Sequence, residues 1–224
     1  MSLGVNIYKY TLNFILNILF PIECLGCKIK GEILCENCSS FIKLAERETE
    51  SNIIALYDYR DPLIKKVIWN LKYYHHHFIG NKLGKILYQE LLEEISDLRM
   101  YTEGKPILVI PVPISRNKTK IRGYNQADKI AQGFCSSGDK GLFELKNNVV
   151  TKKTNTIPQA RINSRERRLK NVIGIFEVKN SEIIKGRTII VIDDVTTTGG
   201  TIKEMMKILK KAGAKKVVGF AVAH

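Results

Sequence analysis

The chain has 224 residues, of which 44% are hydrophobic, and its 36 Lys and Arg outnumber 22 Asp and Glu to give a formal net charge of +14. The hydrophobic content is enough for a core, and the length fits one large domain or one domain with a small module. The basic excess is typical of a polyanion-binding surface but also occurs in proteins that never bind nucleic acid, and the lack of a Gly-x4-Gly-Lys-Ser/Thr motif excludes a P-loop ATPase.

The first twenty residues contain an apolar stretch that is interrupted by Asn13 and Asn17. The stretch is too short to span a bilayer, and no small-residue cleavage site for signal peptidase follows it. We expect a short amphipathic helix that packs on the body of the protein, with contact to a membrane surface as the alternative. The prediction is a cytoplasmic protein without stable membrane insertion.

Four cysteines follow in two Cys-x2-Cys pairs, Cys24 with Cys27 and Cys35 with Cys38. Each pair can form a tight turn with its thiolates on one ion, and two such turns complete a tetrahedral sulfur shell. Disulfides are the weaker explanation in a reducing compartment, whereas an iron–sulfur cluster stays open as an alternative to structural zinc. A segment this small needs such a metal to fold, so we predict a four-cysteine zinc module.

The rest of the chain alternates predicted strands and helices, which indicates an α/β fold with a parallel sheet flanked by helices. We predict strands at 53–59, 106–110, 149–150 and 217–222, and helices at 62–72, 78–98 and 124–134. The predicted domains are residues 1–50, with the N-terminal helix and the zinc module, and residues 51–224.

Two basic segments lie in the middle of the chain, where residues 105–170 contain 15 Lys or Arg. Arg116 and Arg122 belong to the first segment, which follows a predicted buried strand, and a guanidinium there suits a pyrophosphate group. The second segment opens with Pro158 and is interpreted as a mobile flap over phosphates or as a nucleic-acid contact. Its candidate residues are Gln159, Arg161, Arg165 and Arg168. The alternative for both segments is a solvated charged face.

The most informative run begins at Thr188 with an apolar strand and continues into Asp193 and Asp194. A hydroxyl- and glycine-rich turn follows, and apolar residues then recur at helical spacing to Gly213. Unpaired N–H groups at such a helix N-terminus favour a phosphate. The candidate phosphate-binding residues are Thr197, Thr198, Gly199, Gly200 and Thr201.

The acidic pair narrows the choice of phosphate compound, because carboxylates repel a bare phosphate but accept hydrogen bonds from the hydroxyls of a ribose. The segment resembles the phosphoribosyl pyrophosphate (PRPP) loop of type I phosphoribosyltransferases. Two other interpretations remain: an ordinary β-turn-α connection, and a magnesium-binding carboxylate pair of a phosphoacceptor domain.

Several motifs occur together along nearly the whole chain, and together they resemble the ComF family. They are the four cysteines, Tyr57-x-Tyr59, Leu71-Lys72-Tyr73, Pro111-Val-Pro113, Arg122 to Ala127, Gln159, Arg165, Arg168-x2-Asn171, Phe176 and Asp193-Asp194-Val195. The resemblance implies a type I phosphoribosyltransferase fold with an appended zinc module. It also implies a role in natural competence, in carrying transforming single-stranded DNA into the cytoplasm beside a helicase-like partner.

Catalysis itself stays open at this point. An enzyme of this kind would displace pyrophosphate from the anomeric carbon of PRPP with magnesium, with Asp193 and Asp194 on the sugar hydroxyls and Arg122 and Arg116 on the pyrophosphate. Purine-salvage relatives carry an aspartate at the position of Thr197, and a threonine cannot accept a proton at neutral pH. The alternative is an inactive phosphoribosyltransferase fold that binds single-stranded DNA or serves as an adaptor.

Overall fold

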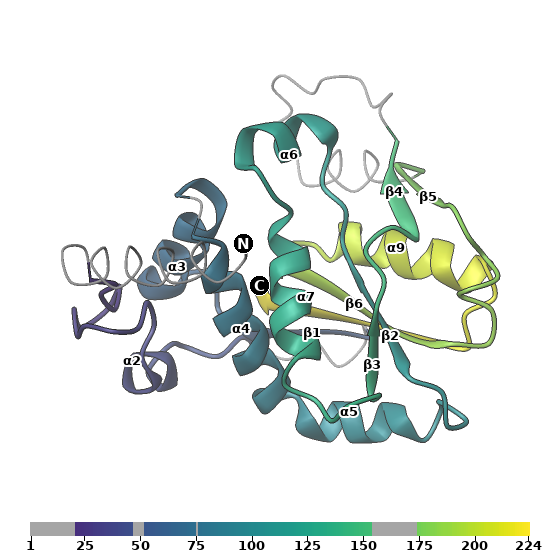
Figure 1. Ribbon diagram of the computed structural model, residues 1–224, viewed down its shortest axis with the longest axis horizontal. Coiled ribbons are helices and arrows are strands. Elements are labelled where there is room, and N and C mark those ends of the chain that lie inside the picture. The colour runs from purple at the N-terminus through teal and green to yellow at the C-terminus, as the bar shows by residue number, and fades with distance from the viewer. Residues whose placement is uncertain (1–20, 47–51, 75, 154–173) are drawn as a thin grey trace, which may run out of the picture. The chain divides into compact units, whose positions relative to one another are not determined.

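The structure is a computed structural model that describes residues 21–46, 52–74, 76–153 and 174–224 (Figure 1). It divides into two compact units, with the division between Ile42 and Lys43. The proposed domain division at 50/51 stays a prediction, since residues 47–51 lie outside the described part. The predicted N-terminal helix and the flap residues Gln159, Arg161, Arg165 and Arg168 also lie outside it. No helix within the described ranges is long and apolar enough to cross a membrane.

The described part of the first unit, residues 21–42, contains the short helix α2 (Glu36–Ser40) and a bridge between Glu23 and Lys30. The buried hydrophobic side chains of this part are Cys24, Ile33, Leu34 and Ile42. Four such side chains contribute little apolar burial, which is consistent with stabilisation of these residues by a metal.

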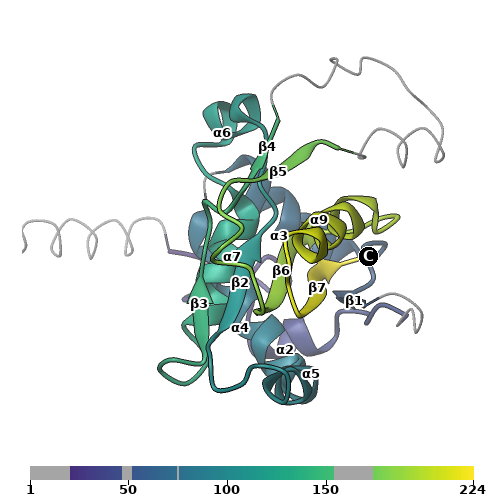
Figure 2. The same ribbon diagram turned by 90° about the vertical axis from the view of Figure 1, so that its right-hand side faces the viewer.

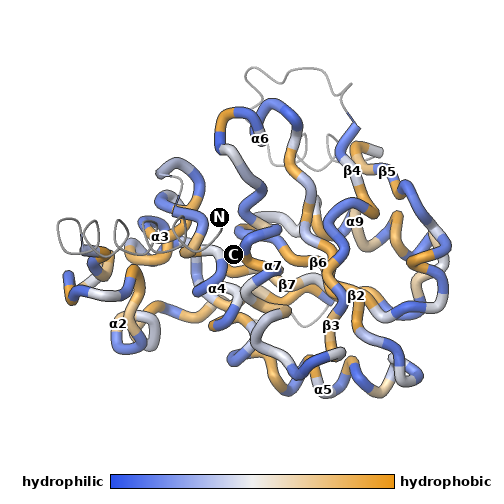
Figure 3. Tube along the Cα trace, viewed as in Figure 1, coloured by the Kyte–Doolittle hydropathy of each residue, from blue (hydrophilic) through white to orange (hydrophobic). Residues whose placement is uncertain are grey.

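The second unit is built on a five-stranded parallel sheet with the order β1-β7-β6-β2-β3. The strands are β1 (Ile53–Tyr57), β2 (Ile107–Pro111), β3 (Phe143–Leu145), β6 (Thr188–Val195) and β7 (Lys216–Ala223). The central strands β2, β6 and β7 are the hydrophobic ones in Figure 3 and are almost fully buried, as expected of a sheet covered on both faces. A separate antiparallel pair is formed by β4 (Val150–Lys152) and β5 (Phe176–Val178).

Helices cover the two faces of this sheet, with α7 (Gln126–Cys135) on one face and α9 (Gly200–Lys211) on the other (Figure 2). The other helices in the described part of this unit are α3 (Pro62–Tyr73), α4 (His77–Glu90), α5 (Leu92–Arg99) and α6 (Arg116–Arg122). Asp61 caps α3 by accepting hydrogen bonds from the backbone N–H groups of Leu63 and Ile64.

Glycines bring α4 and α7 into backbone contact. A Cβ atom added at Gly84 would lie 2.0 Å from the carbonyl oxygen of Ile130, and one added at Gly133 would lie 2.1 Å from that of Asn81. The absence of side chains at these positions therefore sets the distance between the two helices, and α4 forms a second layer behind α7.

The predicted parallel α/β sheet is confirmed, with local differences. The helix expected at 78–98 is two helices, because Leu91 leaves the helical region with φ −115° and ψ 27° while its side chain stays buried. Helix α6 and the strands β3 and β5 were not predicted. Strand β6 also continues to Val195, so the acidic pair belongs to the strand itself.

Candidate functional site

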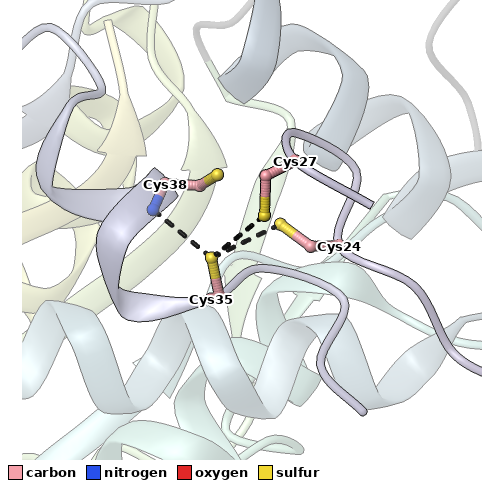
Figure 4. A group of neighbouring side chains, drawn as sticks. All are labelled: Cys24, Cys27, Cys35 and Cys38. Atoms are coloured by element: carbon pink, nitrogen blue, oxygen red, sulfur yellow. Dashed lines mark hydrogen bonds between the residues drawn. The ribbon is translucent and has the colours of Figure 1, made fainter. Parts of the chain in front are cut away.

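The four cysteines of the first unit converge, with all four sulfur atoms within 4.8 Å of one another (Figure 4). The Sγ atom of Cys35 lies 3.7 Å from those of Cys24 and Cys27. Four sulfurs at about 2.3 Å from a tetrahedral zinc ion are separated by about 3.8 Å, so the cluster has the size of a zinc site. The predicted four-cysteine cluster is confirmed as one compatible with structural zinc.

Hydrogen bonds and charge in this cluster also favour a cation. Burial alone would raise the pKa of Cys24, but backbone N–H groups of Cys35, Cys27 and Gly26 outweigh it and lower that pKa to about 6. The side chain of Cys27, together with burial, raises the pKa of Cys38 to about 12. The raised pKa keeps the Cys38 thiol protonated at neutral pH, and a bound cation would favour its thiolate form. The left-handed backbone that closes the first turn falls on Lys28 (φ 68°).

A cavity of about 180 Å³ in the second unit is lined by residues at the carboxyl ends of β2 and β6. Ligands of open α/β sheets bind at such an edge. Its charged side chains are Lys72, Lys118, Arg122, Lys152, Asp193 and Asp194, and Thr201 and Gln126 are among its polar ones. The sequence prediction named Asp193, Asp194, Arg122 and Thr201 for this site, and the structure brings them together.

The negative charge of Asp193 and Asp194, at the end of β6, is only partly neutralised by neighbouring groups. The Oδ1 atom of Asp193 accepts a hydrogen bond from the backbone N–H of Asp194 at 2.9 Å, and the Oδ2 atom of Asp194 lies 3.3 Å from the Nζ atom of Lys72. Burial, and after it the neighbouring carboxylate of Asp194, raises the pKa of Asp193 to about 8. The pair therefore carries less than its full negative charge at neutral pH.

The turn between β6 and α9 supplies free donors. Thr196 anchors it by donating its N–H to the carbonyl of Ala223, and Gly199 takes φ 70° before α9 begins. The backbone N–H groups of residues 197–202 have no acceptor among the described residues. Such a row of N–H groups at a helix N-terminus suits a phosphate.

The predicted phosphate-binding residues do not all face the same cavity. Thr201 lines the cavity with the acidic pair, whereas Thr197 lines a second cavity of about 400 Å³ with Asp58, Arg60 and His224. The turn at Thr198, Gly199 and Gly200 joins these two residues. Arg116 begins α6, is exposed and is absent from the described lining of either cavity.

Several residues of the segment from Arg122 to Ala127 make distinct structural contacts. Arg122 donates from Nη1 to Oε1 of Gln126 at 2.8 Å, and Gly123 ends α6 with φ 76°. Tyr124 donates its hydroxyl to the carbonyl of Leu71, and Asn125 caps α7. Gln126 is 1% exposed, and its Nε2 atom has no hydrogen-bond partner within the described part of the chain. This buried donor in the wall of the cavity is therefore available to a ligand.

Sequence reasoning missed Lys72 and Lys152 as site residues. Lys118 belongs to the basic segment that the sequence placed at the same edge of the sheet as Asp193 and Asp194, although no separate role was predicted for it. Lys72 and Lys152 come from α3 and β4 and reach the cavity only through the tertiary fold. Burial and the charge of Lys118 lower the pKa of Lys152, an effect that Asp193 partly offsets.

Comparison with known proteins agrees with this architecture. The phosphoribosyl transferase domain family matches residues 81–224. Competence protein F of Haemophilus influenzae is 28% identical over 214 residues, which are 90% of this chain and 90% of that protein. Competence protein ComFC of Bacillus subtilis is 32% identical over 119 residues, or 53% of this chain and 45% of that protein.

Among solved structures, the allosteric regulatory enzyme of purine biosynthesis aligns with a TM-score of 0.40 and 20% identity over 66% of this chain. The chain spans 25% of that protein's length. The family match, the two competence proteins and the cysteine cluster together confirm the fold that the resemblance implied. The chain belongs to the phosphoribosyl transferase domain family, as a ComF-type phosphoribosyltransferase-like protein with four clustered cysteines at its N-terminal end.

Proposed function

We propose that the cavity at the end of β6 binds PRPP or a closely related ribose phosphate. The observation that carries this proposal is the meeting of two carboxylates, four cations and a turn with free N–H groups at one edge of the sheet. Asp193 and Asp194 accept hydrogen bonds from the ribose hydroxyls, and residues 197–201 hold the 5-phosphate. Arg122 binds the pyrophosphate through paired N–H groups.

Magnesium enters with the ligand, where it would neutralise the pyrophosphate oxygens. If the protein turns over, pyrophosphate leaves the anomeric carbon and an acceptor replaces it. The side chain at Thr197 supplies no general base, so the acceptor must bring its own nucleophile or meet a base from elsewhere.

Calorimetric titration of the zinc-loaded protein with PRPP and magnesium tests this function. We expect Asp194→Asn to weaken binding by about tenfold or more, because hydrogen bonds to a charged acceptor contribute roughly 1.5–3 kcal/mol. Asp97→Asn, an exposed change of the same kind on α5, is the matched control. Unchanged affinity of the Asp194 variant, or no binding by the unaltered protein, would reject the assignment.

The zinc module and the cellular role belong to the same proposal. The cysteine cluster holds structural zinc, and the protein works in the cytoplasm in natural competence. Two relatives are named competence proteins, which supports this role. In this proposal each domain has its own function. Residues 1–50 bind zinc and form a docking module for a helicase-like partner, and residues 51–224 bind the ribose phosphate.

A specific surface supports single-stranded DNA as a second ligand. Three aromatic side chains near the end of α3, namely Trp69, Tyr73 and Tyr74, are 56%, 50% and 59% exposed. The rings of Trp69 and Tyr73 lie 4.3 Å apart, and the Arg122 guanidinium lies 5.4 Å from the centre of the Tyr73 ring. Exposed rings beside cations are how proteins stack unpaired bases without reading their sequence.

Trp69 is the only tryptophan of the chain, so its fluorescence reports on this surface directly. We expect an unstructured oligonucleotide to quench it, with affinity falling steeply as salt is added. Tyr74→Ser should weaken binding, whereas Tyr101→Ser, at an exposed tyrosine that also faces a lysine, should not. Equal effects of both changes would argue against base stacking here.

A further inference from the structure

Lys72 enters the cavity from outside the domain that the family match covers. The match begins at residue 81, whereas Lys72 lies in the last turn of α3. Its Nζ atom is 3.3 Å from the Oδ2 atom of Asp194, and only 19% of its side chain and 13% of that of Asp194 are exposed. The Lys72 ammonium is thus mostly shielded from solvent and paired with one of the two proposed ribose-binding carboxylates, an arrangement that calls for a functional explanation.

Both sequence neighbours of Lys72 are held by contacts to the segment that carries Arg122. Leu71 is fully buried, and its carbonyl oxygen accepts a hydrogen bond from the hydroxyl of Tyr124. On the other side Tyr73 lies under the Arg122 guanidinium. The end of α3 is thus tied to the segment that also carries Arg122 into the cavity.

The balance of charge changes when a ribose enters. Ribose hydroxyls that donate to Asp194 compete with the Lys72 ammonium for the same carboxylate oxygens. An ammonium that loses its partner in a mostly buried position must find another anion or incur a desolvation cost. Among the described lining residues the other cations are Lys118, Arg122 and Lys152. The second carboxylate, Asp193, is itself assigned to the ribose hydroxyls, so the ligand supplies the new anion.

The size of the positive charge points to more than one phosphate group. Among the described lining residues, four cations and two ionised aspartates give a net charge of +2, and a proton on Asp193 makes this +3. The free N–H groups of the turn accommodate the 5-phosphate, which leaves the side-chain cations for a second anionic group. The unpartnered Nε2 atom of Gln126 lies in the same wall and can donate to that group.

We propose that Lys72 is a specificity-determining residue. Its ammonium group pairs with Asp194 in the free protein and moves to a diphosphate on the anomeric carbon of the ribose when the ligand binds. The ligand is then recognised as a unit: its hydroxyls release Lys72 from Asp194, and its diphosphate captures it. A ribose monophosphate releases the lysine without offering this second partner. The inference rests on the proposed function of the cavity and assigns to Lys72 the discrimination between ribose 5-phosphates with and without a diphosphate at C1.

The test compares three ligands by calorimetry with magnesium present: PRPP, inorganic pyrophosphate and ribose 5-phosphate. Lys72→Met keeps most of the length of the side chain and removes its charge, Lys72→Arg keeps the charge, and Lys65→Met changes an exposed lysine of the same helix as a control. We expect Lys72→Met to weaken PRPP and pyrophosphate by about tenfold or more and ribose 5-phosphate by less than about threefold. Lys72→Arg should restore most of the difference, and Lys65→Met should change none of the three.

Three results would overturn the inference while PRPP binding by the unaltered protein stands. Tighter binding of all three ligands by Lys72→Met would show that the lysine only blocks Asp194. Equal weakening of all three with a lower melting temperature would show a structural role, and no change would show none. No binding of PRPP by the unaltered protein would overturn the proposed function, and this inference would fail with it.

Discussion

Replacing Asp193 by Asn should make the ligand-free protein more stable, because the ionised carboxylate opposes folding. The pKa of Asp193 is about 8 in the folded protein, whereas a free aspartate has a pKa of about 3.9. A raised pKa means that the folded chain holds the proton more tightly than the unfolded chain. The stability associated with that proton is complete below about pH 3.9 and is lost as the pH rises through about 8.

The magnitude follows from the size of the shift. A pKa of about 8 in place of about 3.9 sets a ceiling of about 5.5 kcal/mol at pH 9, because each tenfold change in proton affinity corresponds to about 1.4 kcal/mol. The asparagine must itself be buried, which costs roughly 1–3 kcal/mol, although its Oδ1 atom can still accept the hydrogen bond from Asp194. We therefore expect a gain of at most about 2.5–4.5 kcal/mol in the free energy of unfolding at pH 9, or several degrees in melting temperature.

Urea unfolding followed by Trp69 fluorescence at pH 6.5 and pH 9 measures this gain. The advantage of Asp193→Asn should grow with pH up to about 8 and then level off. Asp194→Asn is the charge-matched control. It removes the partner of Lys72 and should be neutral or destabilising. A gain that does not depend on pH, or no gain at all, would refute the argument that burial and Asp194 hold a proton on Asp193.

Further predictions concern the metal, the helix packing and the pyrophosphate contact. Protein treated with a strong chelator should release about one zinc ion per chain, and Cys35→Ser should retain less metal by colorimetric assay; full occupancy in that variant would contradict the four-sulfur site. Gly133→Ala should cost about 1–3 kcal/mol in unfolding experiments, although alanine normally favours a helix by about 1 kcal/mol, because its Cβ atom would meet the carbonyl of Asn81. Arg122→Lys should weaken PRPP binding about tenfold in calorimetry, since one ammonium cannot reproduce paired guanidinium contacts; equal affinity would place the pyrophosphate elsewhere.

The elements that the sequence predicted well are those with a strong local pattern. The apolar run before Asp193 predicts a buried strand, and the spacing of apolar residues after Gly200 predicts α9. Helix α6 escaped notice because none of its residues is buried, so no apolar periodicity marks it. Its ends do carry signals, namely Ser115 as the capping residue and Gly123 in the left-handed conformation.

The residues of the candidate site also differ in how well the sequence predicted them. Asp193, Asp194 and Thr201 lie within one strand–turn–helix unit, so a linear motif is enough to group them. Lys72 belongs to a different helix, and its meeting with Asp194 depends on how α3 is positioned by the rest of the fold. A local sequence pattern carries no information about such a contact. The role of Lys72 in the cavity therefore became visible only in the three-dimensional structure.

The pairing of β1 with β7 determines where the chain can be cut to isolate the phosphoribosyl transferase domain. Cutting the chain at the family boundary, before residue 81, would delete β1 and α3 together. Strand β7, whose residues are almost all buried, would then become an open edge with unpaired backbone groups along an apolar surface. Fragments of that kind are prone to self-association, so an excised domain has to begin upstream of β1, near Lys43, to behave as a single molecule.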